Sequence, residues 1–289
     1  MAQEKLSYVF PAGTKDFIPV EKSAAAHNGI YRGKDLTSYF DSGDMSTAIA
    51  NGTFENIFIG DYITKSITLP AITYTDKAGD EQTLEAETLS IGWYVAGLDY
   101  FYNVGDPYTQ THHILLVSYG IPQRYVAMNP KVDGNDTTAG GYIGSDMWRI
   151  HMPRYSTAVK NTFGSNHVLT HKEYLTNSVD NTANSMAGGG ILGYANGGVY
   201  VDVDVNIPNE NMLLGSNIYS SSPFDAGEST LLWPIIRLAG HKIDGGVWEW
   251  TRSVASSTNF CVLNGHKLPG TIAASFKGMG GIRPYFLLY

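Results

Sequence analysis

The sequence predicts an α+β fold that is rich in β-strands and carries a few helices and long loops. Charged residues make up only 16% of the 289 residues, against about 25% in average soluble proteins, whereas 43% are hydrophobic. The 32 glycines and 19 tyrosines are typical of a protein with many turns between aromatic strands. Segments of β-branched and aromatic residues recur along the chain, and residues 280–289 end it in such a strand.

Four segments have the composition or periodicity of β-strands. β-branched and aromatic residues dominate the first two, the third is a continuous apolar run typical of a buried central strand, and the fourth alternates as a half-buried strand does. In chain order they are residues 57–70, 89–102, 113–118 and 199–205. A further segment, residues 168–175, predicts a strand that leads into a short helix.

Helices are expected in three further places. The segment 145–163 is the longest, with Pro153 as a kink or a new start and Gly164 just after its end. Residues 208–214 predict a short helix. A further helix is expected over residues 35–51, where Gly52 stops it. Its apolar positions are Leu36, Phe40, Met45 and Ile49.

The remaining long segments are expected to lack regular structure. Residues 1–30 have the pattern of an arm, and the charged, glycine-containing segment 76–86 predicts a loop or an exposed hairpin tip. Asp, Gly and Asn make residues 133–141 a turn-rich loop. Residues 177–198 are low in charge and rich in Gly, Asn and Ala, which predicts a long flexible excursion.

Charge and cysteine usage exclude several classes of function. The net charge is −8 and the pI about 5.4, with no run of Lys or Arg, so we expect no nucleic-acid partner. No apolar stretch approaches the roughly 18 residues of a membrane span. The start of the chain lacks a secretion signal, and the single Cys261 has no partner for an internal disulfide. These features predict synthesis in a reducing cytoplasm, with Cys261 packed as a small hydrophobe.

Histidines and carboxylates suggest several metal or catalytic sites, none with a complete pattern. Neighbouring His112 and His113 point to opposite faces of a strand, and His171 with Glu173 lacks further ligands nearby, so surface hydrogen bonding is expected of that pair. Carboxylates that could supply calcium ligands or a glycoside-hydrolysing pair are Asp133 with Asp136, Asp202 with Asp204, and Asp99 with Asp106. We therefore predict no catalytic residue, no metal and no cofactor.

We expect the C-terminal unit, residues 247–289, to form a structural clasp, that is, a set of side chains that closes the fold by holding the terminal strand in place. Trp248 and Trp250 share one face of a strand and are expected in the core. Arg283 can pair with a carboxylate or with carbonyl groups next to Trp250, and its planar fork would lock the terminal strand. Gly281 permits a close approach before that strand, and Pro284, which lacks an N–H, favours an edge position.

The same unit resembles the end of C-type-lectin-like domains in bacteriophage virion proteins. The resemblance rests on Trp250-Thr251-Arg252-Ser253-Val254, on Asn259-Phe260-Cys261-Val262 with a turn at Gly265, and on Gly281-Ile282-Arg283-Pro284-Tyr285-Phe286. It adds Arg252 to the clasp, and it makes the loop residues Ser256, Ser257, Thr258 and Asn259 a candidate contact loop. Further segments similar to this phage group are residues 31–36, 52–62, 96–100, 111–113, 139–145 and 169–175.

The resemblance implies a non-enzymatic structural protein of the virion, made in the host cytoplasm. Residues 1–54 would form an arm and helix that anchor the chain to other virion proteins, and residues 55–289 a C-type-lectin-like domain for attachment to the host surface. A glycan or protein of the host cell would be the ligand, and a homo-oligomer, with a trimer favoured, the assembly. Further candidate contact loops are residues 177–198, 218–229 and 264–280.

Two alternatives stay open at this point. One is a capsid decoration or head-fibre protein with a mainly structural role. The other is an enzyme of the formylglycine-generating type, whose fold is related but whose chemistry needs a pair of reactive cysteines where this chain has only Cys261. The Glu-Pro-Asn tripeptide, through which many lectins of this fold bind calcium and sugar, does not occur.

Overall fold

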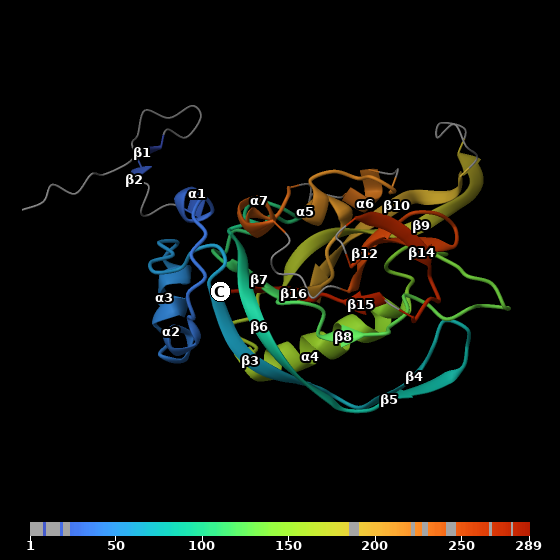
Figure 1. Cartoon of the computed structure of the whole chain (residues 1–289), viewed down its shortest axis with the longest axis horizontal. Helices are drawn as coiled ribbons and strands as arrows, with labels where there is room; N and C mark the ends of the chain where they lie inside the picture. Colours follow the sequence, from blue (N-terminus) through green and yellow to red (C-terminus); the bar gives the residue numbers. More distant parts are fainter. Residues whose placement is uncertain are drawn as a thin grey trace, which may run out of the picture.

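Two five-stranded sheets organise the described part of the chain (Figure 1). Strands hold 37% and helices 20% of the described residues, which makes this a β-rich mixed fold. The computed structural model describes residues 8–9, 18–19, 24–184, 191–220, 223–226, 231–240, 247–265, 268–278 and 280–289. Most of the predicted arm, residues 1–30, lies outside these ranges. Its described strands are β1 (Tyr8–Val9) and β2 (Ile18–Pro19), which pair with each other.

The first sheet is antiparallel and contains the predicted central strand. Its spatial order is β11 (Val205–Asn206), β16 (Tyr285–Leu288), β7 (Ile114–Ser118), β6 (Glu87–Leu98) and β3 (Tyr62–Leu69). All five residues of β7 are buried in the middle of the sheet, which confirms the prediction for 113–118. The strands predicted over 57–70 and 89–102 are also present: β3 is shorter than predicted, and β6 both begins and ends earlier.

The second sheet is built mainly from the C-terminal unit. Its order is β14 (Pro269–Ala273), β13 (Asn259–Leu263), β12 (Trp248–Val254), β15 (Gly280–Ile282) and β8 (Gln123–Arg124). β12 and β15 run parallel, and the other neighbours are antiparallel. The chain then returns to the first sheet as β16, so the last ten residues join the two sheets.

The helix predicted over 35–51 is broken into two. α2 (Thr37–Asp41) and α3 (Asp44–Ala50) are separated at Gly43, whose φ of 84° lies in the left-handed region. Both lie beside β3, and the short α1 (Ala24–His27) precedes them (Figure 1). Met45 and Ile49 are fully buried in the same core as the sheets, so this part of the predicted segment 1–54 packs directly against the predicted domain 55–289.

The long helix starts where the sequence predicts a new start. A π-helix, η2 (Met147–His151), runs into α4 (Met152–Phe163) with Pro153 in its first turn, and Gly164 follows with φ 91°. α5 (Glu210–Leu214) confirms the short helix predicted over 208–214, and the side chain of Asn209 caps it by accepting from the Met212 amide at 2.9 Å. The remaining short helices are α6 (Pro223–Ala226) and α7 (Pro234–Ala239).

The flexible excursion predicted over 177–198 is wrong for the described residues. β9 (His171–Asn184) and β10 (Ile191–Val203) form a long antiparallel hairpin, and residues 185–190 lie outside the described chain. The helix expected after 168–175 is likewise replaced by β9. The glycines mark irregular register: a Cβ at Gly198 would lie 2.4 Å from Cε1 of Tyr174. They therefore make room for side chains instead of loosening the chain.

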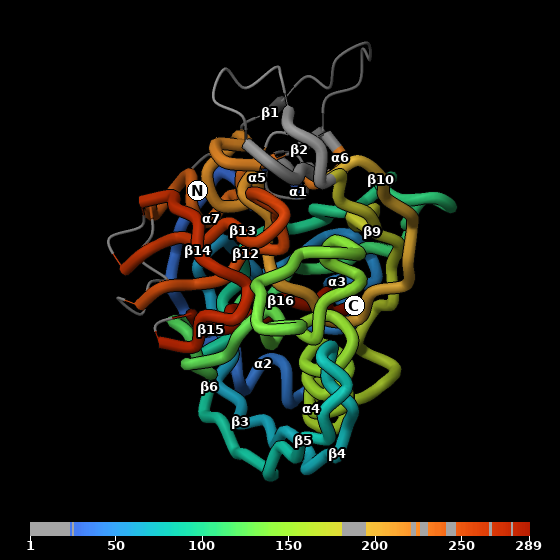
Figure 2. The backbone as a smooth tube through the Cα atoms, turned by 90° about the vertical axis from the view of Figure 1, so that its right-hand side faces the viewer, coloured from blue at the N-terminus to red at the C-terminus, as the bar shows by residue number. Residues whose placement is uncertain are grey.

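A second hairpin extends from the lower right of the molecule in Figure 1. β4 (Ile72–Thr75) and β5 (Glu81–Leu84) pair through a turn, which confirms the exposed-hairpin alternative for residues 76–86. The base of the hairpin is held to α4, because the Arg154 guanidinium donates to the carbonyls of Pro70 and Glu85 on either side of it (Figures 1 and 2).

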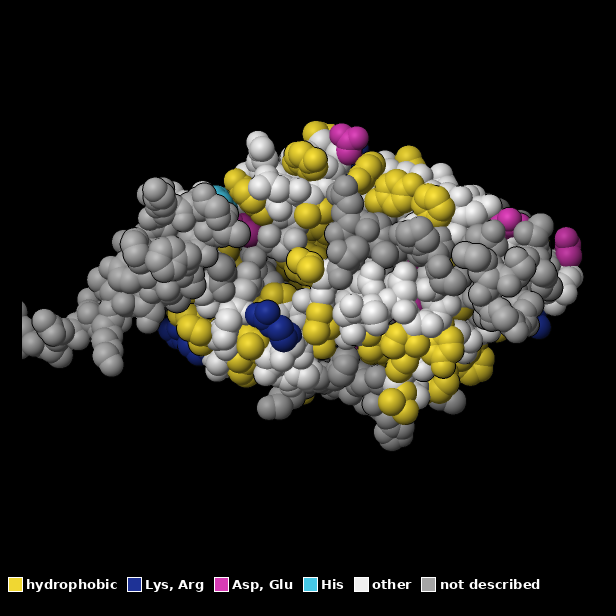
Figure 3. Space-filling view, turned by 90° about the horizontal axis from the view of Figure 1, so that it is seen from above, with side chains coloured by type: hydrophobic (Ala, Val, Ile, Leu, Met, Phe, Trp, Pro, Cys, Tyr) yellow, Lys and Arg dark blue, Asp and Glu magenta, His cyan; other side chains and the backbone are white. Residues whose placement is uncertain are grey.

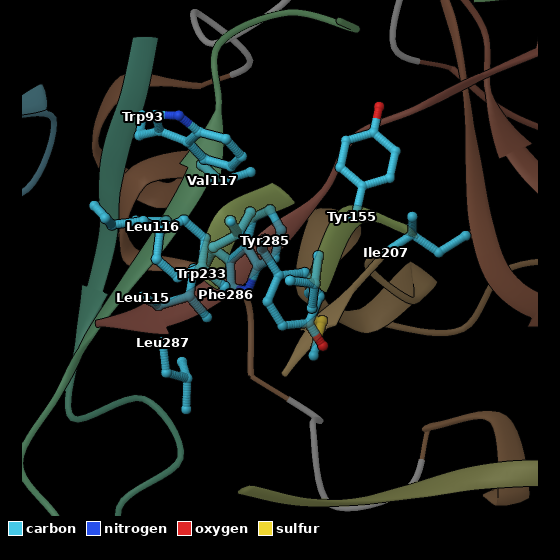
Figure 4. Packing of buried hydrophobic residues seen from close by; sticks show 14 of the residues in the cluster. Trp93, Leu115, Leu116, Val117, Tyr155, Ile207, Trp233, Tyr285, Phe286 and Leu287 are labelled. Carbon is cyan, nitrogen blue, oxygen red and sulfur yellow. The ribbon is translucent and has the colours of Figure 1, made fainter. Parts of the chain in front are cut away.

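One hydrophobic core fills the space between the sheets and α4. Aromatic rings from distant segments meet there: Trp93 packs edge-on against Phe286 at 5.1 Å, and Trp233 against Tyr285 at 5.5 Å (Figure 4). Leu115, Leu116 and Leu287 come from neighbouring strands of the first sheet. Among the described residues, no helix has the length and apolar character needed to cross a membrane.

Candidate functional site

The predicted clasp is closed by a buried ion pair. Arg283 Nε donates to the Glu249 carboxylate, and Arg283 Nη1 donates to the Ser118 carbonyl at 3.0 Å. Both charged side chains are 1% exposed. Glu249 is the residue before Trp250, so the expected pairing of Arg283 beside Trp250 is present. The guanidinium thereby ties β12 of the second sheet to β7 of the first.

The other clasp residues divide into confirmed and corrected positions. Trp250 is fully buried and its Nε1 donates to the Val126 carbonyl at 2.6 Å, whereas Trp248 is only half-buried. A Cβ at Gly281 would lie 2.2 Å from Cγ2 of Ile121, so the expected close approach is present. The edge position of Pro284 is wrong: it lies buried in the connection between two interior strands, where a missing N–H interrupts no ladder.

A second buried charge cluster surrounds Glu173. Arg252 donates to its carboxylate, Tyr285 Oη donates to both oxygens at 2.8 Å, and His171 Nε2 lies 3.0 Å from Oε1. Burial alone would raise the pKa of Glu173, but the Arg252 charge and these hydrogen bonds lower it to about 2. The surface role expected for His171 and Glu173 is therefore wrong, because β12 and β16 cover this face of β9.

The candidate contact loop is a fixed turn between β12 and β13. Thr138 donates through its N–H to the Ser257 carbonyl at 2.9 Å and through Oγ1 to the Ser256 carbonyl at 2.7 Å. The Thr258 hydroxyl donates to Asn259 Oδ1 at 2.8 Å. Thr258 is exposed, and the other three residues are half-buried. The loop therefore presents a small, rigid surface.

Two further contact loops are also held in place where they are described. The buried Glu210 carboxylate accepts from the backbone amides of Ile218, Tyr219 and Ser220 at 2.9 to 3.2 Å. This fixes the start of the loop 218–229, although residues 221–222 and 227–230 lie outside the described chain. The loop 264–280 contains β14, and residues 266–267 and 279 of it are outside the described ranges.

The candidate histidine and aspartate sites are occupied by structural contacts. Asp99 accepts from the His113 amide at 3.0 Å and pairs with His112 Nδ1 at 2.8 Å. The buried His113 ring accepts from the Phe101 amide at 3.0 Å, and burial lowers the pKa of His113 to about 3. These contacts leave Asp99 as an anchor for the two histidines, and its pairing with Asp106 stays untested.

The other candidate carboxylates also make structural contacts. Asp133 lies in a tight turn with φ 49°, and Asp136 accepts from the Ser275 amide at 3.0 Å. Asp202 pairs with Lys172 at 2.9 Å, and Asp204 with Lys160 at 2.6 Å. Within the described ranges, no group of three or more His, Cys, Asp or Glu is placed to hold a metal ion.

A pocket that the sequence did not reveal lies beneath the β4–β5 hairpin. It has a volume of about 270 Å³, and it is lined from the hairpin, the segment after β8, η2 and the loop before β15. Its polar wall includes Gln123, Asp146 and His151. These three residues lie far apart in the sequence and follow no local motif, so only the folded chain reveals them as neighbours.

The comparisons with known proteins return nothing for this chain. No family model, curated protein or solved structure matches it.

Proposed function

We propose that the chain is a non-enzymatic structural protein of a bacteriophage virion, and that it displays a C-type-lectin-like domain for attachment to the host surface. One observation carries the proposal: large aromatic side chains are exposed around a rigid β-sheet scaffold. Tyrosine supplies wide contact area with little loss of conformational entropy, which is why binding loops use it. Among the residues that the structure describes, the exposed tyrosines are Tyr31, Tyr108, Tyr119, Tyr125 and Tyr219.

The surface chemistry supports recognition of an uncharged or weakly charged partner. On the face shown in Figure 3, hydrophobic side chains gather in several places and charged side chains are few. The clasp supports the same proposal, since β12 and β13 hold the candidate contact loop between them. Partners in the particle would be other virion proteins held through the N-terminal arm and further copies of this chain, with a trimer favoured.

The environment of Cys261 argues against the formylglycine-generating alternative. Its side chain is fully buried in β13, and burial raises the pKa of the thiol well above its ordinary value. The reactive species in cysteine chemistry is the thiolate, which this environment disfavours. We therefore do not carry that activity into the proposal.

The proposal is tested by binding of the purified, fluorescently labelled protein to host cells. We expect saturable binding that falls at least about fivefold when Tyr108, Tyr119 and Tyr219 are replaced together by Ala, because exposed aromatic anchors dominate recognition surfaces. Leu231→Ala, which removes another exposed apolar side chain, is the matched control and should bind as the parent does. Absence of saturable binding to any host cell would contradict attachment and favour capsid decoration.

A further inference from the structure

The outermost strand of the second sheet, β14, pairs on one side only among the described residues. It lies beyond β13 in the sheet order and at the left of the molecule in Figure 2. The other edge strands offer less backbone to a further strand. β8 and β11 have two residues each, and β3 exchanges backbone hydrogen bonds through Tyr62 with Lys34 and Leu36.

The register of β14 on β13 shows which of its backbone groups point away from the sheet. The two strands pair without a bulge. At one end the Asn264 amide donates to the Leu268 carbonyl, and at the other the Ala274 amide donates to the Thr258 carbonyl, both at 2.9 Å. In an antiparallel ladder, pairs that bond to each other alternate with pairs whose groups point outward. The residues whose backbone groups point to the open edge are therefore Pro269, Thr271 and Ala273.

These outward groups are complementary to a second copy of themselves. In an antiparallel pairing about a two-fold axis at Thr271, the Thr271 N–H of each copy donates to the Thr271 carbonyl of the other. The Ala273 N–H of each copy then meets the Pro269 carbonyl of the other. Pro269 has no N–H to return. The carbonyl that would have accepted it, that of Ala273, already accepts from the Phe276 amide at 3.0 Å within its own chain.

The composition of the edge also favours pairing with a like strand. No charged residue occurs from Leu268 to Phe276, whereas exposed edge strands are commonly protected by charge. Proline is another common protection, but the N–H that Pro269 lacks is one that this pairing does not need. Leu268, just before the strand, is 60% exposed, and Thr271 is exposed at its centre. A second copy would therefore meet an uncharged and accessible edge.

We propose that β14 of one copy pairs with β14 of a second copy across a two-fold axis, so that their second sheets join into one continuous sheet. The occupant is a second copy because the open donors and acceptors match those of the same strand reversed, as an isologous contact requires. Such a contact closes after two copies, so a trimer would need a different surface. This inference goes beyond the proposed function, since it holds wherever the chain acts.

The first test is self-association of the full chain, measured by sedimentation velocity from about 5 µM to about 500 µM, because small contacts of this kind are weak. We expect a reversible step that doubles the mass, whether it starts from one copy or from a trimer. Amide hydrogen exchange gives a local measurement at the same concentrations. The Thr271 and Ala273 amides should exchange more slowly as the protein concentration rises, because pairing removes them from water.

Charge exchange at the two-fold axis tests the register. The pairing places the two side chains at position 271 opposite each other, so Thr271→Lys or Thr271→Glu alone puts like charges face to face. Each variant should weaken the association about fivefold or more, and an equimolar mixture of the two should restore it, because opposite charges then meet. Thr68→Lys changes an exposed threonine of β3 and is the control, which should associate as the parent does.

Several results would overturn the inference. Among them are a mass that stays constant over the whole concentration range, and an association that Thr271→Lys leaves unchanged. A Lys and Glu mixture that associates no better than either variant alone would also contradict it. The exchange measurement on the parent chain needs no variant, so it decides the inference even if a charged variant fails to fold: equally fast exchange of the two amides at every concentration would overturn it.

Discussion

At the scale of single residues, buried arginines tie the second sheet to its neighbours: Arg283 links it to the first sheet, and Arg252 links it to the β9–β10 hairpin. Arg283 reaches Glu249 and Ser118, and Arg252 reaches Glu173, all at most 3% exposed. Removing one member leaves the other as an unpaired buried charge, which is far less favourable than removing both. The clasp is thus a matter of charge pairing as well as of aromatic packing.

Replacing Arg283 tests this directly. Arg283→Met should lower the free energy of unfolding by about 3 to 5 kcal/mol in urea denaturation, because Glu249 loses its cation. The double change with Glu249→Leu should recover a large part of that loss. Lys65→Met, which breaks the exposed pair with Asp41, is the control and should cost less than about 1 kcal/mol. Equal losses for the single and double variants would contradict the charge account.

Two buried histidines predict how stability depends on pH. Burial lowers the pKa of His113 to about 3 and that of His151 to about 4, from about 6.5 in the unfolded chain. Between the folded-state and the unfolded-state pKa values, only the unfolded chain binds these two protons. The contribution of the neutral histidines to the free energy of unfolding is therefore complete above pH 6.5 and is lost as the pH falls. Burial raises the pKa of Asp225 to about 6, which opposes part of the loss because the folded state takes up that proton.

The variant His151→Phe removes one of these two titrating groups, and so measures its share of the pH dependence of unfolding. Near pH 5 it should reduce the slope of unfolding free energy against pH by roughly 1 kcal/mol per pH unit, the value for one proton. Urea denaturation at half-unit steps from pH 4.5 to 7 measures it. An unchanged slope would show that His151 titrates alike in the folded and unfolded states.

At the scale of single helices and strands, the sequence predicted the elements whose signals are local and missed those that depend on a facing strand. The continuous apolar run of β7 and the proline and glycine at the two ends of α4 act locally, so the sequence alone was sufficient to place them. Strands were predicted over 168–175 and 199–205, at the start of β9 and the end of β10, but the rest of the hairpin, within 177–198, was missed because its glycines resemble those of a loop. Their actual role depends on Tyr174 and Ser178 of the facing strand, which no local pattern reveals.

Gly198→Ala tests that role. The added methyl group would collide with Tyr174 and lie 3.0 Å from the Leu175 carbonyl, so we expect a loss of about 1 to 3 kcal/mol and faster amide exchange along β9. Gly270→Ala is the matched change in β14, where the Cβ meets only Val262 at an ordinary 3.7 Å, and it should be nearly neutral. Equal behaviour of the two variants would support the flexible-loop interpretation instead.

At the scale of the whole molecule, the C-terminal unit links the architecture to the proposed function. Its strands complete both sheets, Arg283 pairs across them, and Trp250 holds the segment that lines the pocket beneath the β4–β5 hairpin. The sequence predicted a carboxylate or carbonyl groups next to Trp250 as the partner of Arg283, and the structure shows that the carboxylate is that of Glu249. It could not predict the pocket, since Gln123, Asp146 and His151 become neighbours only after both sheets have formed.

The central claim, that the chain is a virion protein, is tested most directly by locating it on virus particles. If the proposal holds, immunogold electron microscopy of purified phage particles, with antibody against residues 55–289, should place label at the tail tip or fibres. Label confined to the capsid would favour the capsid-decoration alternative. Intact particles without label would contradict the proposal that the chain is a virion protein.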